Sequence, residues 1–406
     1  MNLRKCQEEY AKLLVLGGVC MEKGERVVIA SDVQSMEMAE LVAKTAYEYG
    51  ASKVEMRWSS SRVDAYAYEY GNVDFLKEFD VWEEKKWELQ VEQLPCVINL
   101  VSSEPIEFSS EMLANQAEVM KMRMPMIKKY RNQMDGKFKW TIGGVATQSW
   151  ADQVFPGEEG NLEHLWRSIF TTLMITGEGD SIKKWDETWE KLHAHEDYLN
   201  NLNLKTIHVE TSLGTDLTMD LSSDVAWEGG SDRTLGNAPN LPSAEVFTSP
   251  VASSTEGVMV SSKPLVCQNQ VIEGIRLVFK EGKIVEATAE KGEEFFKKYL
   301  ETDEGALRLG EIAIIDKYSP IKKAGHIFYH TLFDENIACH VAIGCAFPFL
   351  LKEFTTMTQE EIEAKTELNK SSIHCDIMFG TADVNVTGTT VDGEVIQIMR
   401  DGEWCN

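Results

Sequence analysis

Two short stretches in the second half of the sequence place a histidine close to carboxylates. His340 follows Asp334 and Glu335, and His374 stands two residues before Asp376. Neutral imidazole combined with carboxylate is a ligand mixture that suits zinc, cobalt or manganese, whereas calcium takes oxygen ligands alone. The spacing therefore predicts a metal site in this part of the chain.

Two glutamates extend this set of candidate ligands. Glu311 opens the apolar run GEIAII, where it is either a rigid ligand or a solvent-facing strand start, and Glu245 lies in a loop between two prolines. With Glu335 and Asp376 they make four carboxylates beside two histidines, more than a single structural zinc ion needs. Because bridging carboxylates hold paired cations about 3.5–4 Å apart, this surplus favours a catalytic metal pair that activates water. Composition leaves carbonyl and phosphoryl substrates equally open.

The residues around His340 predict a helix that begins near Ile337 and carries the histidine about one turn in. Asp334 is then expected to cap this helix, because its short carboxylate can accept the unpaired N–H groups of a helix start. Glu335 is either a direct ligand or a residue that orients the ligands. The alternative interpretation of His340 is a histidine that is simply buried in the core. Its carboxylate neighbours favour the interpretation as a metal ligand.

The residues around His374 predict an extended segment. Side chains two apart in a strand point to the same side, so His374 and Asp376 can meet one metal cluster while Cys375 points away. Cys375 and Cys339 are therefore expected to be packing residues. The remaining histidine candidates are weaker. His193 and His195 are expected on the surface of a helix, and His326 and His330 are minor candidates for lining the pocket.

The first half of the chain alternates strand-like and helix-like segments. Apolar runs predict strands, and the longer periodic segments between them predict helices; the strands are expected at 25–31, 52–58, 96–102 and 139–147, and the helices at 36–50 and about 110–134. Such alternation indicates an α/β domain with a mostly parallel sheet. No GxGxxG or GxxxxGK[ST] pattern follows these strands, so nothing supports nucleotide binding.

From about residue 205 the pattern changes to short alternating strands. A hairpin is expected around Glu281-Gly282, a helix at 291–301, and a second hairpin near the end of the chain. These features predict an α+β, β-rich C-terminal catalytic domain. The expected domains are residues 1–204 and residues 205–406.

Charge and cysteine content restrict the partners and the compartment. The 406 residues include 40 basic and 66 acidic side chains, for a formal charge of −26. This balance argues against nucleic acid and anionic membranes, which require a basic surface. No apolar stretch approaches the roughly 18 residues of a membrane span, and the N-terminus lacks a signal-peptide core. Eight cysteines without framework spacing favour the reducing cytoplasm.

Four ordered motifs resemble the M29 family of metallo-aminopeptidases, the aminopeptidase T and aminopeptidase S group. They are NLPSAEVFTSP (240–250), RLGEIAIIDKYSPI (308–321), TLFDENIACHVAIG (331–344) and NKSSIHCDIMFG (369–380). The resemblance implies a cytosolic exopeptidase that removes N-terminal residues from peptides with two divalent ions, commonly zinc, cobalt or manganese. It also implies a homodimer, with the active site on the C-terminal domain inside a cavity that the pairing closes.

The resemblance also implies a ligand set and shows one departure. The matching positions are Glu245, Glu311, His340, His374 and Asp376, with Glu335 as a further candidate. The family pattern H-x-A-x-G-x-x-Y ends in a tyrosine that assists catalysis, but this chain has Phe347 there. Phenylalanine cannot donate to a developing oxyanion, and such a donor is worth about 2.7–4 kcal/mol. Tyr318 and Tyr329 are the nearest substitutes in sequence.

The leading hypothesis is therefore a dinuclear aminopeptidase in which Glu311 takes the proton of the attacking water. A second hypothesis is a catalytically weakened metal-binding homodimer with a scaffold or peptide-binding role, marked by Phe347. A third, a two-metal phosphoesterase, lacks a basic cluster for phosphate near the ligands.

Overall fold

The computed structural model describes residues 2–268 and 270–406. The chain folds into two compact units, Met1–Trp185 with Ser231–Leu241 and Asp186–Gly230 with Pro242–Asn406. Strand β5 (Leu204–Glu210) opens the β-rich region, and the functional division at residue 204 stays a prediction.

The first unit is built on a five-stranded sheet in which all strands are parallel. Its order is β2 (Lys53–Ser59), β1 (Arg26–Asp32), β3 (Cys96–Val101), β4 (Trp140–Gly144) and β8 (Asn240–Leu241). Val27, Val28 and Ile29 of β1 are all buried, as expected for a parallel strand covered on both faces. The predicted α/β domain is thus confirmed.

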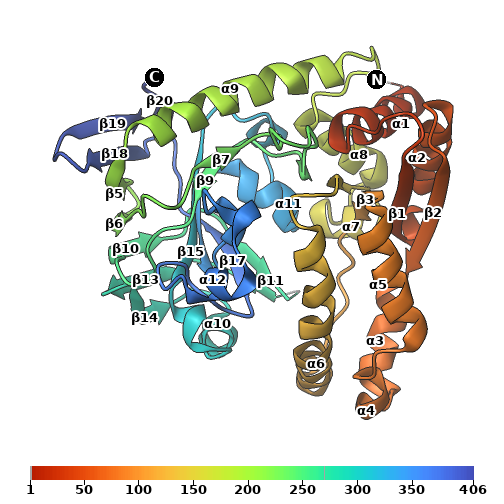
Figure 1. Ribbon diagram of the computed structural model, residues 1–406, viewed down its shortest axis with the longest axis horizontal. Helices are drawn as coiled ribbons and strands as arrows, with labels where there is room; N and C mark the ends of the chain where they lie inside the picture. Colours follow the sequence, from red (N-terminus) through yellow and green to blue (C-terminus); the bar gives the residue numbers. More distant parts are fainter. Residues whose placement is uncertain (1, 269) are drawn as a thin grey trace. The chain divides into compact units, whose positions relative to one another are not determined.

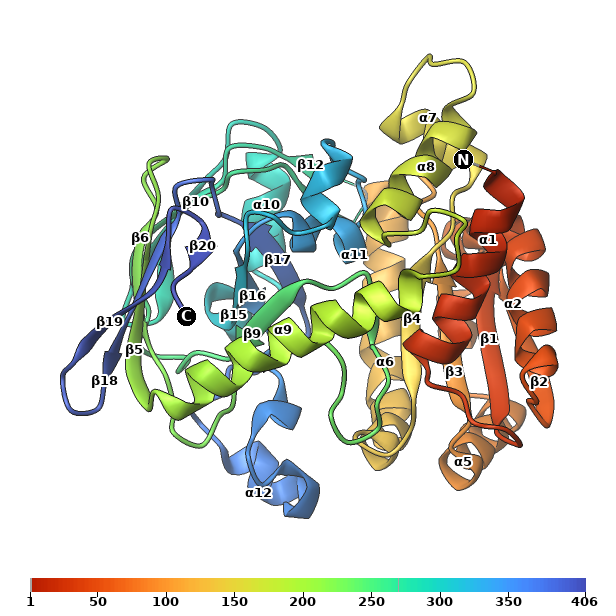
Figure 2. The ribbon, with the colours of Figure 1, turned by 90° about the horizontal axis from the view of Figure 1, so that it is seen from above.

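The helices of this unit pack in two groups. One group contains α1 (Leu3–Lys12), α2 (Met36–Glu48) and α8 (Asn161–Thr172); in the other, α6 (Ser110–Met134) contacts α3 (Ser61–Tyr70), α4 (Val73–Leu76) and α5 (Val81–Gln93). Figure 2 shows α2 running alongside β1 and β2. The helices expected near 36–50 and 110–134 are confirmed. Helix α5 was not predicted, because its apolar residues Val81, Trp82 and Leu89 are exposed and form no stripe.

The second unit contains an eight-stranded antiparallel sheet (Figure 1). Its order is β14 (Lys283–Thr288), β13 (Arg276–Lys280), β10 (Glu256–Val260), β6 (Asp216–Asp220), β5, β18 (Asn385–Thr390), β19 (Val395–Arg400) and β20 (Glu403–Trp404). The hairpin predicted at Glu281-Gly282 joins β13 to β14, and both residues have positive φ, at 51° and 74°, as the tightest hairpin turns require.

A five-stranded antiparallel sheet lies in the same unit and carries the candidate site. Its order is β17 (His374–Met378), β16 (His340–Gly344), β15 (Leu309–Ile315), β9 (Glu245–Thr248) and β7 (Glu228–Gly229). Every residue of β15 and β16 is buried. The unit also contains the two-stranded ribbon of β11 (Leu265–Cys267) and β12 (Gln270–Ile272) and most of α9 (Ser181–Asn201). Three shorter helices are α10 (Glu293–Leu300), α11 (Thr331–Asp334) and α12 (Gln359–Ala364).

Two features bear on the expected environment. None of the helices in the described residues is both long and apolar enough to cross a bilayer. All eight cysteines are free thiols.

Candidate metal centre

Four adjacent strands of the five-stranded sheet present the candidate ligands on one face. The ligands are Glu245 on β9, Glu311 on β15, His340 on β16, and His374 and Asp376 on β17. Residues that pair across antiparallel strands share a face, and the register places Ala342 between Glu311 and Asp376. The sheet's hydrogen bonds therefore bring together residues that lie far apart in the sequence.

Small residues make space for the ligands on this face. Ala342 lies between Glu311 and Asp376, and Ala313 pairs with His340. Gly344 pairs with His374 and has a φ of +103°, where a Cβ atom would lie 2.1 Å from the Ile373 carbonyl oxygen. Only glycine adopts this conformation without strain, so the strand next to His374 depends on it.

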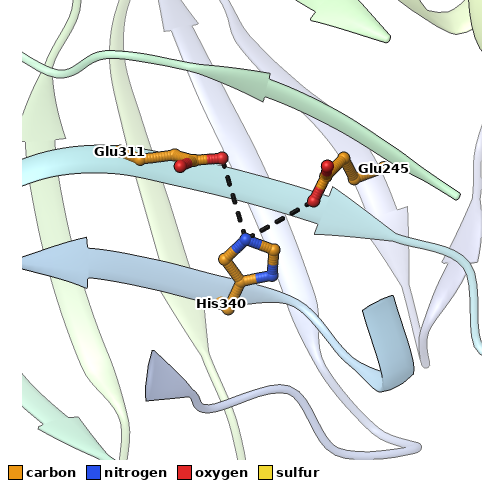
Figure 3. Close-up of side chains that lie close together, drawn as sticks. All are labelled: Glu245, Glu311 and His340. Atoms are coloured by element: carbon orange, nitrogen blue, oxygen red, sulfur yellow. Dashed lines mark ion pairs between the residues drawn. The ribbon is translucent and has the colours of Figure 1, made fainter. Parts of the chain in front are cut away.

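The imidazoles and carboxylates lie within ligand-sharing distances. Nε2 of His340 is 3.5 Å from Glu245 Oε2 and 3.7 Å from Glu311 Oε1, and Figure 3 shows both carboxylates converging on it. Nε2 of His374 is 3.1 Å from Glu311 Oε2 and 3.3 Å from Asp376 Oδ1. The two oxygens of Glu311 thus face different histidines.

Backbone carbonyls orient both histidine rings. Nδ1 of His374 donates to the Cys345 carbonyl oxygen at 2.7 Å, and Nδ1 of His340 lies 3.4 Å from the Ala338 carbonyl oxygen. A proton on Nδ1 leaves the lone pair on Nε2, which is the atom directed at the carboxylates. In its neutral form each ring would therefore present the Nε2 lone pair that a metal ion requires.

The ligand atoms form two groups of three. Glu245, Glu311 and His340 make one group, and Glu311, His374 and Asp376 make the other; within each group the ligand atoms lie within 4.8 Å of one another. Glu311 belongs to both. The donors are oxygen and imidazole nitrogen without cysteine, which is the chemistry of a catalytic rather than a structural site.

Burial and like charges make this cluster a poor place for uncompensated carboxylates. Burial, with the charges of Glu311 and Asp376, raises the pKa of Glu245 to about 7. Burial disfavours a charged His340, but the hydrogen bond to Glu311 and the surrounding carboxylates outweigh it and raise the pKa of the imidazole to about 9. The cluster takes up protons to offset its negative charge, and divalent cations would supply the same compensation. The residues therefore fit a divalent metal.

This excess protonation predicts that the metal-free protein loses stability in alkaline solution. Folded His340 keeps its proton up to about pH 9, whereas an unfolded histidine loses it near pH 6.5. The pKa of His374 is raised in the same direction. Between these values the folded state binds more protons, so the free energy of unfolding should fall by up to about 1.4 kcal/mol per pH unit and per group.

Urea unfolding of chelator-treated protein across this pH interval measures the slope. A saturating divalent ion should remove it, because the cation replaces the protons. A metal-free protein that becomes more stable over the interval would contradict the arrangement.

The predicted helix around His340 is wrong. The chain forms a single 3-10 turn at Glu335–Ile337 and then extends, so His340 is the first residue of β16. Pairing with β15 and β17 prevails over any helical tendency of this short apolar segment. The capping role of Asp334 is wrong as well, since its carboxylate accepts the backbone N–H groups of Phe328, at 2.7 Å, and His330, at 2.9 Å.

Glu335 lies beside the ligands without belonging to either group of three. Burial, together with the charges of Asp376, Glu245 and Glu311, holds the pKa of Glu335 well above its usual value. The side chain of Asn336 donates to Glu335 Oε1 at 3.3 Å and accepts the Ala244 N–H at 2.8 Å. Asn336 thus ties Glu335 to the loop before Glu245.

The positioning role of Asn336 was not predicted from the sequence. The one signal available in the sequence was its place between Glu335 and an apolar segment. In the structure the Asn336 amide is fully buried, and a buried amide must find hydrogen-bond partners.

The cysteines next to the histidines pack away from the ligands, as expected. Cys375 is buried and hydrogen-bonds with Cys267, which also contacts Tyr299. The Cys339 thiol hydrogen-bonds to the backbone of Ile315. Alternation along β17 therefore separates a sulfur-lined face from the carboxylate face.

Phe347 lies against the ligand cluster. Its ring centroid is 4.7 Å from that of His374, 5.7 Å from that of Phe247 and 5.2 Å from that of Phe349. The Tyr318 hydroxyl, suggested as a substitute donor, is exposed and donates to Glu403. The edge of the site beside His374 is thus aromatic.

The weaker histidine candidates have other contacts. His195 stacks on Trp404 with ring centroids 4.1 Å apart and is half-buried on α9; His193 is half-buried as well. The ring of His330 accepts the Leu332 N–H at the start of α11, and burial lowers the pKa of His330 to about 4. The His326 ring lies 4.5 Å from that of Phe328.

Buried carboxylates and imidazoles that converge from adjacent strands are a ligand set that fits the site of a metal-dependent enzyme. Residues 4–404 match the model of the family described as thermophilic metalloprotease (M29), so the chain belongs to the M29 family. Its members are metallopeptidases, hydrolases that act on peptide bonds, and the predicted resemblance is confirmed.

Similar proteins cover the whole chain. Aminopeptidase AmpS from Bacillus subtilis is 36% identical over 401 residues, which cover 97% of each chain. Aminopeptidase PepS from Streptococcus thermophilus is 33% identical over 412 residues, which cover 99% of this chain and 98% of the relative. The solved structure of AmpT from Thermus thermophilus matches with a TM-score of 0.88 and 31% identity, covering 100% of both chains. The two-part fold predicted from the sequence is confirmed by this match.

Proposed function

We propose that this protein is a dinuclear metal-dependent aminopeptidase that releases N-terminal residues from peptides with a metal-activated water. The observation that carries the proposal is the position of Glu311, whose two oxygens face His340 and His374 separately. A carboxylate shared by two ligand groups is the arrangement that a metal pair uses. The relatives named aminopeptidases support peptides with a free N-terminus as substrates.

The proposed ligands of the two ions are Glu245, Glu311, His340, His374 and Asp376, with Glu335 as a further candidate. When bound, zinc, cobalt or manganese would lower the pKa of a water molecule and polarise the scissile carbonyl. The chain's own residues do the rest. Backbone carbonyls orient the imidazoles, and Asn336 holds the Glu335 carboxylate and the backbone N–H of Ala244, the residue before Glu245.

Glu311 is the proposed proton acceptor. Its carboxylate takes a proton from the attacking water and delivers it to the leaving amine. The Glu311 side chain is buried at the centre of the cluster, which places it close to the proposed position of the water. An acidic pocket at the site would hold the α-ammonium group of the substrate by charge attraction.

The aromatic residues beside His374 favour an apolar first residue in the substrate. Phe247, Phe347 and Phe349 contact one another there, and aromatic rings bury apolar side chains effectively. The protein is proposed to act in the cytoplasm, where its free thiols stay reduced. It is further proposed to act as a homodimer, on the ground of the family resemblance alone.

Metal dependence is the direct test. Chelator-treated protein should release no p-nitroaniline from aminoacyl-p-nitroanilides, and re-addition of zinc, cobalt or manganese should restore release. Leucyl and phenylalanyl substrates should react faster than glutamyl ones, and N-acetylated substrates should not react. Full activity after the metal is removed, or equal hydrolysis of N-acetylated substrates, would contradict the proposal.

A further inference from the structure

The first unit has a cavity at the carboxyl ends of its parallel strands. The strand order β2-β1-β3-β4-β8 reverses direction between β1 and β3, and open parallel sheets bind ligands in the crevice where this reversal occurs. The residues that line the cavity all follow strand ends: Arg62 and Tyr66 follow β2, Glu104 and Ile106 follow β3, and Ser149 and Asp152 follow β4. Its volume of about 500 Å³ is that of a small-molecule site.

A buried carboxylate is the chemical centre of this cavity. The Glu104 side chain is only 6% exposed, and its Oε1 accepts from Arg62 Nε at 2.9 Å. Its Oε2 is buried and has no hydrogen-bond partner among the described residues. A buried charged oxygen without a donor costs free energy, which a ligand with an N–H group would recover.

The neighbouring charges select the kind of ligand. Glu104 and Asp152 outnumber the single cation Arg62, so the cavity attracts an ammonium group and disfavours phosphate. The Arg62 side chain is 66% exposed, and its Nε bonds to Glu104. The terminal guanidinium nitrogens can therefore pair with the carboxylate of a ligand. Tyr66, Pro105 and Ile106 add apolar surface beside these groups.

A side-chain carboxylate holds the Arg62 side of the cavity in place. Asp32, the last residue of β1, accepts from the backbone N–H of Ser61 at 3.0 Å and from its hydroxyl at 3.2 Å. This contact fixes the start of α3, which carries Arg62 and Tyr66, against the end of β1. The acidic and basic sides of the cavity are therefore held by separate strand ends.

We propose that this cavity binds a free α-amino acid, with its ammonium group on Glu104 and its carboxylate on Arg62. Tyr66 and Ile106 contact its side chain. The ligand is of the same chemical class as the product of the proposed reaction, so the site would sense product; that meaning rests on the proposed function, whereas the binding itself does not.

Isothermal titration of the full chain with L-leucine tests the site. N-acetyl-leucine lacks the ammonium group and isoamylamine lacks the carboxylate, so both should bind at least about tenfold more weakly than leucine. Glu104→Gln should weaken leucine binding by about tenfold or more, and Arg62→Gln should weaken leucine without weakening isoamylamine. Glu118→Gln removes a surface ion pair with Lys77 in the same unit and should change nothing.

Variants of the two sites distinguish the outcomes. Glu311→Gln should leave leucine binding intact, because Glu311 belongs to the metal centre in the second unit. Binding that disappears in Glu311→Gln but survives in Glu104→Gln would overturn the proposal, and so would the absence of saturable binding in the unsubstituted protein. A protein without peptidase activity that still binds leucine through Glu104 would refute the proposed function and leave this site standing.

Discussion

Replacing Glu311 with glutamine is expected to reduce turnover by at least about 10²–10⁴-fold, because the amide cannot accept the proton of the attacking water. Glutamine has nearly the same shape, so the strand β15 and the melting temperature of the chelated protein should change little. The loss should therefore appear in kcat, measured with leucyl-p-nitroanilide at saturating metal. Metal content of the dialysed variant, measured in parallel, separates loss of proton transfer from loss of the ions.

Glu335→Gln is the matched control. Glu335 is a buried carboxylate that acts electrostatically on the same cluster but belongs to neither group of ligands. It should keep more activity than Glu311→Gln. If Glu335→Gln instead abolishes turnover with both ions bound, while Glu311→Gln loses the metal, then Glu335 is the proton acceptor and Glu311 serves only as a shared ligand. Full activity in Glu311→Gln would eliminate the proposed mechanism.

Replacing Phe347 with tyrosine is expected to raise kcat by about 10²–10³-fold, the amount typical of one oxyanion donor. The Phe347 ring packs 4.7 Å from that of His374, so a hydroxyl added to this ring brings a donor to the edge of the ligand cluster. Comparing the rates of the two proteins at equal metal content measures the effect.

Phe349→Tyr controls for added polarity in the same aromatic group, since Phe349 also packs on Phe247 and Phe347. It should leave the rate within a few-fold of the starting value. A Phe347→Tyr protein that is no faster would mean that the reaction already has a donor elsewhere. In that case the phenylalanine is a neutral substitution and the centre is complete without it.

The features that could be predicted from the sequence are those with a local signal. Alternation along 374–376 placed His374 and Asp376 on one side with Cys375 on the other, and turn residues identified the Glu281-Gly282 hairpin. His340 was predicted to lie in a helix, whereas it is the first residue of β16. Five residues of β-sheet are too short for periodicity to distinguish a buried strand from a helical turn.

The features that could not be predicted depend on long-range pairing. Asn336 connects Glu335 to the loop at Ala244, a contact across 92 residues that no local pattern contains. The cavity beside Glu104 is assembled from three separate strand ends, and a lone glutamate after an apolar strand is unremarkable in a sequence. Helix α5 was missed because its apolar side chains face solvent.

The strand register that assembles the centre also determines when it can exist during synthesis. The group of Glu245, Glu311 and His340 needs only β9, β15 and β16, whereas His374 and Asp376 lie on β17, so the complete ligand set forms only when nearly the whole second unit has been made. Contacts of such sequence separation form late, and an ion has no preformed partner on the nascent chain. We therefore expect the complete metal centre to form late in synthesis, with protons offsetting the charge of the cluster until divalent cations bind.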